Sequence, residues 1–173
     1  MTLVGSLPVT EPIPPVINTS PLIFLTKEDL LTLLQTRYST VLVPTTVAKE
    51  IQQYGPLDLT YQTIQKMDWL MMVDTPPASA ELQACNLDAG EASVLAWACA
   101  HPGTEAILDD LAGRRCAERL GIPIRGTLGL VLAAKQQGHI PEAKPVIERL
   151  RQTGMYLSDR VINKALALVG ESL

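Results

Sequence analysis

The sequence has few of the residues that common enzyme chemistries need. Its 173 residues include two histidines, His101 and His139, and three cysteines, Cys85, Cys99 and Cys116. So few histidines argue against a His/Cys zinc site and against a His-dependent nucleophilic triad. The cysteines have neither metal-ligand nor redox spacing. Because each cysteine lies in an apolar, helix-like pattern, we predict core packing for all three and a reducing compartment.

Long apolar runs are also missing. None reaches the roughly 20 residues that a membrane span needs, and the opening MTLVGSLPVTEPIPP lacks the basic start and continuous apolar stretch of a signal peptide. Its four prolines favour an extended chain instead. We therefore predict a disordered tail over residues 1–14, a single domain over residues 15–173, and a cytoplasmic protein without a membrane partner.

Glycine-rich phosphate loops are absent at the places where they would be needed. The turn after the first apolar stretch reads NTSP and contains no glycine, which excludes a dinucleotide-binding turn. Neither a P-loop nor a G-x-S-x-G hydrolase elbow occurs in the chain. Nucleotide cofactors and serine-hydrolase chemistry are therefore poor explanations of this protein.

Charged residues are scarce but unevenly distributed. They make up 18% of the chain, below the roughly 25% of an average soluble protein. Residues 1–112 carry a net charge of −9 and residues 113–173 a net charge of +5. Such an imbalance suggests a polyanionic partner, although a solvated helical surface would explain it equally well.

Short apolar stretches alternate with helix-like segments along most of the chain. We predict strands at 15–18, 40–44, 69–77, 105–110 and 122–126. We predict helices at 26–34, where Thr26 and Asp29 suggest a capping box, and at 45–51, 87–100, 111–121, 127–138, 141–154 and 158–170. Continuous apolar strands between helices indicate an α/β fold with three α/β/α layers and a central parallel sheet of about five strands.

Polar residues follow several of the predicted strands. Asn18 ends the first strand, and Asp109 and Asp110 end the fourth. Glu50 follows the second strand, and Glu91 lies in the first turn of the helix at 87–100. In parallel sheets the site lies beyond the carboxyl ends of the strands, so these side chains should gather there. Such a cluster is repulsive unless a cation neutralises it, and oxygen-only ligands suit Mg²⁺ or Mn²⁺.

Each of these residues also has a purely structural interpretation. Glu50 could be a solvated helix residue in a salt bridge, and Glu91 could simply complement a helix dipole. Asp110 is well placed to cap the helix that follows, as Asp88 is for the helix at 87–100. The remaining candidates are basic and either form a solvated helix face or bind phosphate: Arg114, Arg115 and Arg119.

With these residues in place, the chain resembles a PIN domain. It is most similar to a bacterial and archaeal branch, long classed as a domain of unknown function, that is related to VapC-type toxins. The resemblance runs from about Val16 to Gly170. It rests on the segments VINTSPLIFL, VPTTVAKEI, LDAGEASVLAWA, ILDDLAGRRCAERLG and IPIRGTLGLVLAAKQQGHI. The first two are general for PIN domains, and the last three in this order are specific to the branch.

The resemblance implies a metal-dependent endoribonuclease that acts on RNA, chiefly single-stranded. Carried over by position, the acidic metal ligands and catalytic groups would be Glu50, Glu91 and Asp110. Asp109 would be an auxiliary or alternative ligand. Two hydroxyls, Ser20 and Thr127, would orient water or a ligand. The resemblance further implies a homodimer and a toxin role with a small antitoxin protein as partner.

One position departs from the family pattern. Active PIN nucleases normally have Asp at the end of the first strand, where this chain has Asn18. An amide still offers an oxygen to a metal ion but supplies no negative charge and cannot act as a base. The resemblance therefore implies either an attenuated nuclease or a catalytically inactive PIN-like module that binds RNA or a protein partner.

Overall fold

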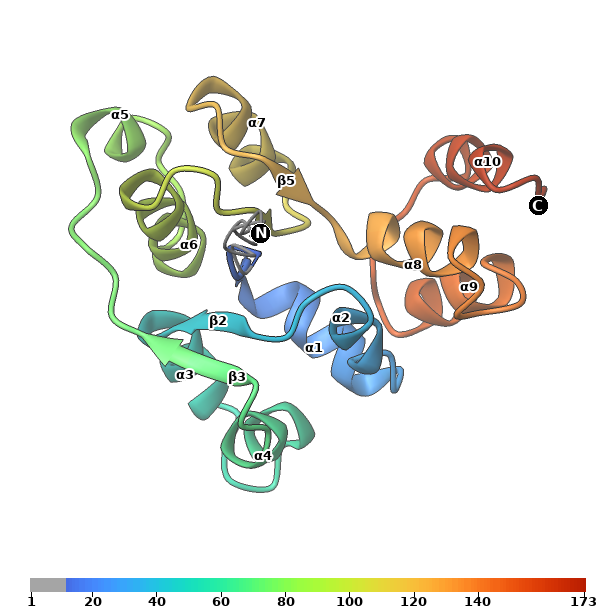
Figure 1. The fold of residues 1–173 in the computed structure, drawn as a ribbon, viewed down its shortest axis with the longest axis horizontal. Helices are drawn as coiled ribbons and strands as arrows, with labels where there is room; N and C mark the ends of the chain where they lie inside the picture. The colour runs from blue at the N-terminus through green and yellow to red at the C-terminus, as the bar shows by residue number, and fades with distance from the viewer. Residues whose placement is uncertain (1–11) are drawn as a thin grey trace, which may run out of the picture.

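The computed structural model describes residues 12–173 and confirms the predicted fold class. Its centre is a five-stranded, all-parallel sheet in the order β3-β2-β1-β4-β5 (Figure 1). The strands are β1 (Val16–Ile17), β2 (Val41–Pro44), β3 (Leu70–Val73), β4 (Ala106–Ile107) and β5 (Ile124–Arg125). Each lies inside a predicted strand and is no longer than four residues.

Helices cover both faces of the sheet. They are α1 (Thr19–Lys27), α2 (Thr32–Gln35), α3 (Thr45–Gln52), α4 (Leu59–Lys66), α5 (Ala80–Gln83), α6 (Ala89–Ala100), α7 (Leu111–Arg119), α8 (Thr127–Gln136), α9 (Lys144–Gln152) and α10 (Asp159–Leu168). Helix α6 packs on β1, β2 and β4 and is flanked by α5 and α7. The other side carries α1, α2 and α8, and α9 and α10 pack against α8 (Figure 1).

The burial of the strands explains why they read as apolar runs without alternation. All four residues of β2 are buried, as are both residues of β1 and β4. Strands of a parallel sheet are covered on both faces, so side chains of either orientation must be apolar. The edge strand β3 is different, because Met71 and Met72 are about half exposed.

The prediction of one helix over 26–34 is wrong, because residues 26–27 end α1, residues 28–31 are not helical and residues 32–34 belong to α2. Helix α1 begins at Thr19, and the hydroxyl of Thr26 donates to the carbonyl of Leu22 inside that helix, 2.6 Å away. Asp29 has a φ of 55° and follows the end of α1, so it cannot belong to a capping box. Pro21 is compatible with the first turn of a helix and was the overlooked signal. Helices α4 and α5, begun by the caps Asp58 and Ser79, were not predicted.

Of the three cysteines predicted to pack in the core, Cys116 is buried there and Cys85 is half-buried against it, but Cys99 is exposed. Cys85, which follows α5, and Cys116 of α7 form a disulfide with Cα atoms 6.1 Å apart. Cys99 is a free, exposed thiol. The sequence separation of 31 between the bonded cysteines gives no local signal of the pairing, which arises when α7 packs beside α6. A disulfide is typical of oxidising compartments, so the cysteines no longer support a reducing one.

Most of the predicted N-terminal tail, residues 1–11 of 1–14, lies outside the described residues. Among residues 12–173, no helix has the length and apolar character needed to cross a membrane.

Candidate active site

The carboxyl ends of neighbouring strands bring the predicted polar residues to one edge of the sheet. Asn18 follows β1, and its backbone N–H donates to the carbonyl of Ile107 in β4 at 2.9 Å. Asp109 and Asp110 follow β4 after one intervening residue, Leu108, and Thr127 follows β5. Because the strands are parallel and paired in register, these positions share one edge, as predicted.

Asn18 and Glu50 converge on Gly90, the second residue of α6. A Cβ atom at Gly90 would lie 2.7 and 2.8 Å from the two carboxylate oxygens of Glu50 and 3.1 Å from Oδ1 of Asn18. Asn18 is only 6% exposed, and its Oδ1 has no hydrogen-bond partner among the described residues. A buried oxygen without a partner is costly, so Asn18 Oδ1 is suited to accept a hydrogen bond or to ligate a cation.

The hydroxyl that contacts this pair is Thr19 and not the predicted Ser20. Thr19 Oγ1 donates to Glu50 Oε2 at 2.5 Å. Ser20 is exposed and takes no part in the contact. Thr19 is the first residue of α1, directly after Asn18, and this adjacency was the only sequence signal for its role.

Glu91 is a buried carboxyl group surrounded by other acids. It is 5% exposed and lies against Gly113 of α7, where an added Cβ would be 3.5 Å from Glu91 Oε1. Burial, the charges of Asp88 and Asp110, and a hydrogen bond shared with Asp110 raise the pKa of Glu91 to about 7. Burial is the main cause of this raised pKa, and the neighbouring acids add to it.

Asp110 does two things. Its Oδ1 accepts a hydrogen bond from the N–H of Ala112 at 2.8 Å and so caps α7, as its structural interpretation predicted. Its carboxylate also lies beside Glu91. Asp88 caps α6 in the same way, accepting the N–H of Glu91 at 2.8 Å. The capping fixes where both carboxylates point.

Asp109 is engaged by the start of α8. Its two oxygens accept hydrogen bonds from the backbone N–H and the hydroxyl of Thr127, each at 2.7 Å. Burial raises the pKa of Asp109, and these bonds and the nearby Arg114 guanidinium oppose the rise. Thr127 therefore anchors Asp109, which leaves that carboxylate less available as a ligand than Glu50 or Asp110.

The predicted basic residues of α7 differ in their surroundings. Arg114 is half-buried, and its Nη1 would lie 2.6 Å from a Cβ at Gly126. It therefore rests on the backbone of Gly126 beside Asp109. Arg115 and Arg119 are exposed on the same helix. Of these three arginines, Arg114 is the one that contacts the residues of the edge.

The donor set fits a hard divalent cation in its chemistry but is not gathered into one cluster. All candidate ligands are carboxylate or amide oxygens, Asn18 Oδ1 is unpartnered among the described residues, and the lack of a Cβ at Gly90 lets that oxygen and the Glu50 carboxylate approach the start of α6 together. Within residues 12–173, no group of three His, Cys, Asp or Glu side chains is close enough to hold a metal ion. The candidate ligands form two neighbouring groups. Asn18 lies with Glu50, and Glu91 lies with Asp110.

The fold and this edge agree with the comparison to known families. The family model DUF3368, described as a PIN domain, matches residues 14–171. The chain therefore belongs to the PIN domain family, whose members are generally nucleases. Among curated proteins, none matches this chain.

Proposed function

We propose that the protein is an endoribonuclease that depends on Mg²⁺ or Mn²⁺. Membership of the PIN domain family supports nuclease activity. The oxygen-only set of side chains at the sheet edge supports a hard divalent ion. Asn18, Glu50, Glu91 and Asp110 would hold the metal, which when bound supplies Lewis-acid stabilisation of a phosphodiester and a more acidic water.

The observation that carries this proposal is the unpartnered Oδ1 of Asn18. It is buried and, like the carboxylate of Glu50, lies close to the backbone of Gly90, which has no side chain. A donor or cation bound by both side chains would satisfy them at once. Thr19, which is hydrogen-bonded to Glu50, fixes that carboxylate in position.

The remaining residues act on the charge and position of the site. Glu91 and Asp110 add negative charge beside the Asn18–Glu50 pair, and the caps of α6 and α7 hold them there. Asp109 and Thr127 connect β4 to α8. They would act by positioning Arg114 and the start of α8 next to the bound RNA.

Asn18 limits the activity that we propose. Replacing a carboxylate by an amide removes one negative charge from the ligand set, so metal affinity and cleavage rate should both be reduced. Asn18→Asp is therefore expected to increase cleavage and to tighten Mn²⁺ binding. The two readouts are cleavage of a mixed single-stranded RNA pool in Mg²⁺, Mn²⁺ or EDTA, and calorimetric titration of the protein with Mn²⁺.

Wild-type cleavage that requires the metal would support the nuclease directly. If the wild type is silent and Asn18→Asp cleaves, the chain is the alternative that we consider, an inactive PIN-like module that binds RNA or a protein. Asn18 is the observation that favours this alternative. Silence in both proteins, with no Mn²⁺ binding by either, would overturn the proposed activity.

The toxin role, the small antitoxin partner, the homodimer and the cytoplasmic location remain proposals that follow from the resemblance. A test in the cell is growth arrest on expression, which a VapC-type toxin should cause and Asp110→Asn should relieve. In the reducing cytoplasm the Cys85–Cys116 disulfide would open, so activity should also be measured with reductant.

A further inference from the structure

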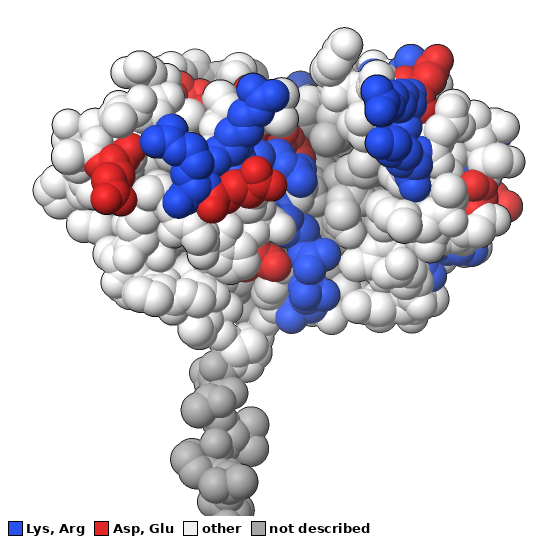
Figure 2. Space-filling view, turned by 90° about the horizontal axis from the view of Figure 1, so that it is seen from above, with Lys and Arg blue, Asp and Glu red and all other residues white. Residues whose placement is uncertain are grey.

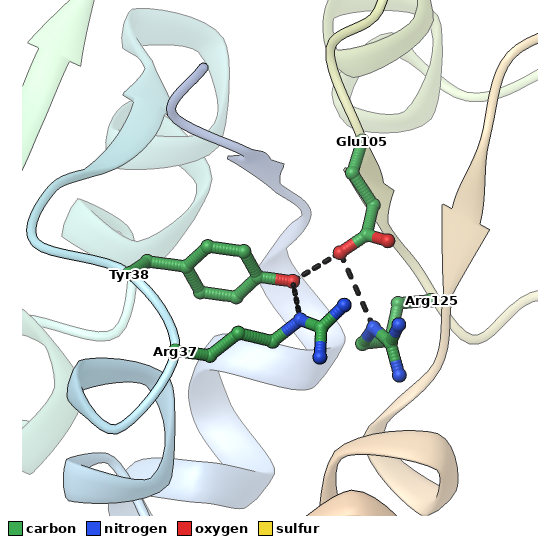
Figure 3. Close-up of polar contacts among 4 residues, drawn as sticks. All are labelled: Arg37, Tyr38, Glu105 and Arg125. Atoms are coloured by element: carbon green, nitrogen blue, oxygen red, sulfur yellow. Dashed lines mark hydrogen bonds and ion pairs between the residues drawn. The ribbon is translucent and has the colours of Figure 1, made fainter. Parts of the chain in front are cut away.

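A second polar cluster lies beside the edge strand β5 and contains none of the acids of the candidate active site. Glu105, just before β4, accepts a hydrogen bond from the hydroxyl of Tyr38 and pairs with Arg125 of β5, with 3.2 Å between Nε and Oε1. Arg37 Nε donates to the Tyr38 hydroxyl oxygen at 3.2 Å. Figure 3 shows the two guanidinium groups side by side below the single carboxylate.

The cluster carries more positive than negative charge. Burial and Glu105 raise the pKa of Tyr38 to about 12, so the phenol is neutral. Arg125 pairs with Glu105, whereas Arg37 contacts the neutral Tyr38 hydroxyl. The two guanidinium ions and the one carboxylate therefore leave an excess of positive charge. Arg37 is exposed, and the side chains of Arg125 and Glu105 are 23% and 21% exposed, so an anion can reach them.

The free hydrogen-bond donors of this cluster suit a phosphate. Both arginines use Nε for their contacts, and within the described part of the chain their Nη atoms have no hydrogen-bond partner. A guanidinium fork with free Nη donors matches the oxygens of a phosphate. The positive charges of the two guanidinium groups repel each other, and a bound anion would offset that repulsion.

The cluster connects directly to the candidate active site. Arg125 is followed by Gly126, and Arg114 rests on the backbone of Gly126 beside Asp109. Arg125 therefore links the contacts of Arg37, Tyr38 and Glu105 to Arg114 at the acidic edge of the sheet. Figure 2, which views the side bearing α7, β5 and α10, shows Lys and Arg side chains within and beside a furrow across that face.

We infer that Arg37 and Arg125 bind backbone phosphates of a single RNA strand that runs along β5 into the acidic edge. This inference rests on the proposed nuclease function, because it takes RNA as the ligand. We name Arg37, Arg125 and Arg114 the arginine track. Backbone contacts of this kind carry no base specificity and make affinity depend on salt.

The test measures binding of a short, labelled single-stranded RNA in EDTA, so that no cleavage occurs. Arg37→Gln and Arg125→Gln should each weaken binding about threefold to tenfold, and the double variant more. For each phosphate that the protein no longer binds, the slope of log K against log salt should fall by about 0.7. Arg37→Lys should keep the slope because it keeps the charge.

Arg149→Gln is the matched control. Arg149 lies in α9, is about half exposed and pairs with Glu28 at 3.3 Å, so its replacement removes the same charge elsewhere. The RNA affinity of this variant should stay within about twofold of the wild type. Arg37 is exposed and makes no ion pair within residues 12–173, so Arg37→Gln tests the track even if Arg125→Gln unfolds.

The outcomes distinguish the proposal that the arginine track binds RNA from the proposal that the protein is a nuclease. The wild type could cleave RNA with Mn²⁺ while the arginine-track variants bind and cleave RNA equally well. In that case RNA binding by the track is refuted and the nuclease activity is supported. If the wild type does not cleave but binds RNA, and the track variants lose that binding, the track stands without the nuclease. No RNA binding by the wild type at low salt would overturn the track.

Discussion

The acidic edge and the arginine track are two polar regions of one sheet with opposite deficits. At the edge, Glu91 and Asp110 crowd together, and Asn18 keeps a buried oxygen without a donor among the described residues. Beside β5, Arg125 pairs with Glu105, and Arg37 contacts the neutral Tyr38 hydroxyl, so two arginines accompany one carboxylate. The first region lacks positive charge and the second lacks negative charge. A phosphodiester with a divalent cation would supply both, which is why we interpret the two regions together.

The largest effect is expected when a carboxylate of the acidic edge is replaced by an amide. Glu91→Gln and Asp110→Asn should each lower RNA cleavage about 1000-fold, or about 4 kcal/mol of transition-state stabilisation, because each removes a charge from the ligand set. Timed cleavage assays with Mn²⁺ measure this. The matched control is Asp88→Asn, which keeps the cap of α6, since Asn caps as well as Asp. Full activity in both test variants would refute the assignment of the site.

A smaller effect concerns Tyr38, which contacts both Arg37 and Glu105, and is measured through the pH dependence of stability. The pKa of Tyr38 is about 12 in the folded protein, above its ordinary value of 10. Tyr38 therefore holds its proton more tightly when folded, and its stabilising contribution is complete below about pH 10 and lost as the pH rises towards 12. The free energy of unfolding should fall by about 2 kcal/mol over this window.

Tyr38→Phe isolates that contribution, because phenylalanine cannot ionise. Urea unfolding of both proteins at about pH 8 and about pH 11 gives the difference between them. The difference should shrink as the pH rises. A pH-independent difference would show that neither burial nor Glu105 raises the pKa of Tyr38 in the folded protein.

The smallest expected effect tests the close approach of the Glu50 and Asn18 oxygens to Gly90. Gly90→Ala places a methyl group within 3.1 Å of Glu50 and Asn18 oxygens, so both side chains must move. We expect about a tenfold loss of cleavage and weaker Mn²⁺ binding, although alanine favours helices by about 1 kcal/mol. Gly129→Ala in α8 is the control, because its Cβ would meet only Arg125 Cγ at 3.7 Å. Equal activity in the two variants would remove Gly90 from the site.

Much of the fold could be predicted because its signals are local. Apolar strands between helices predicted the parallel sheet, and β2 is buried on both faces as that pattern requires. Caps followed from residue type, as Asp88 and Asp110 show. Local signals also misled, since Thr26 and Asp29 resemble a capping box although α1 begins at Thr19.

The sequence by itself determined which chemistry gathers at the carboxyl edge, because strand order along the chain places Asn18, Asp109 and Asp110 after strands that must run parallel. Only the tertiary structure decided which atoms meet there. Contacts such as Thr19 with Glu50 join residues 31 positions apart, and Tyr38 with Glu105 joins residues 67 apart. The Cys85–Cys116 disulfide is of the same kind. Such pairings depend on how helices pack on the sheet, and no periodicity or spacing along the chain encodes that packing.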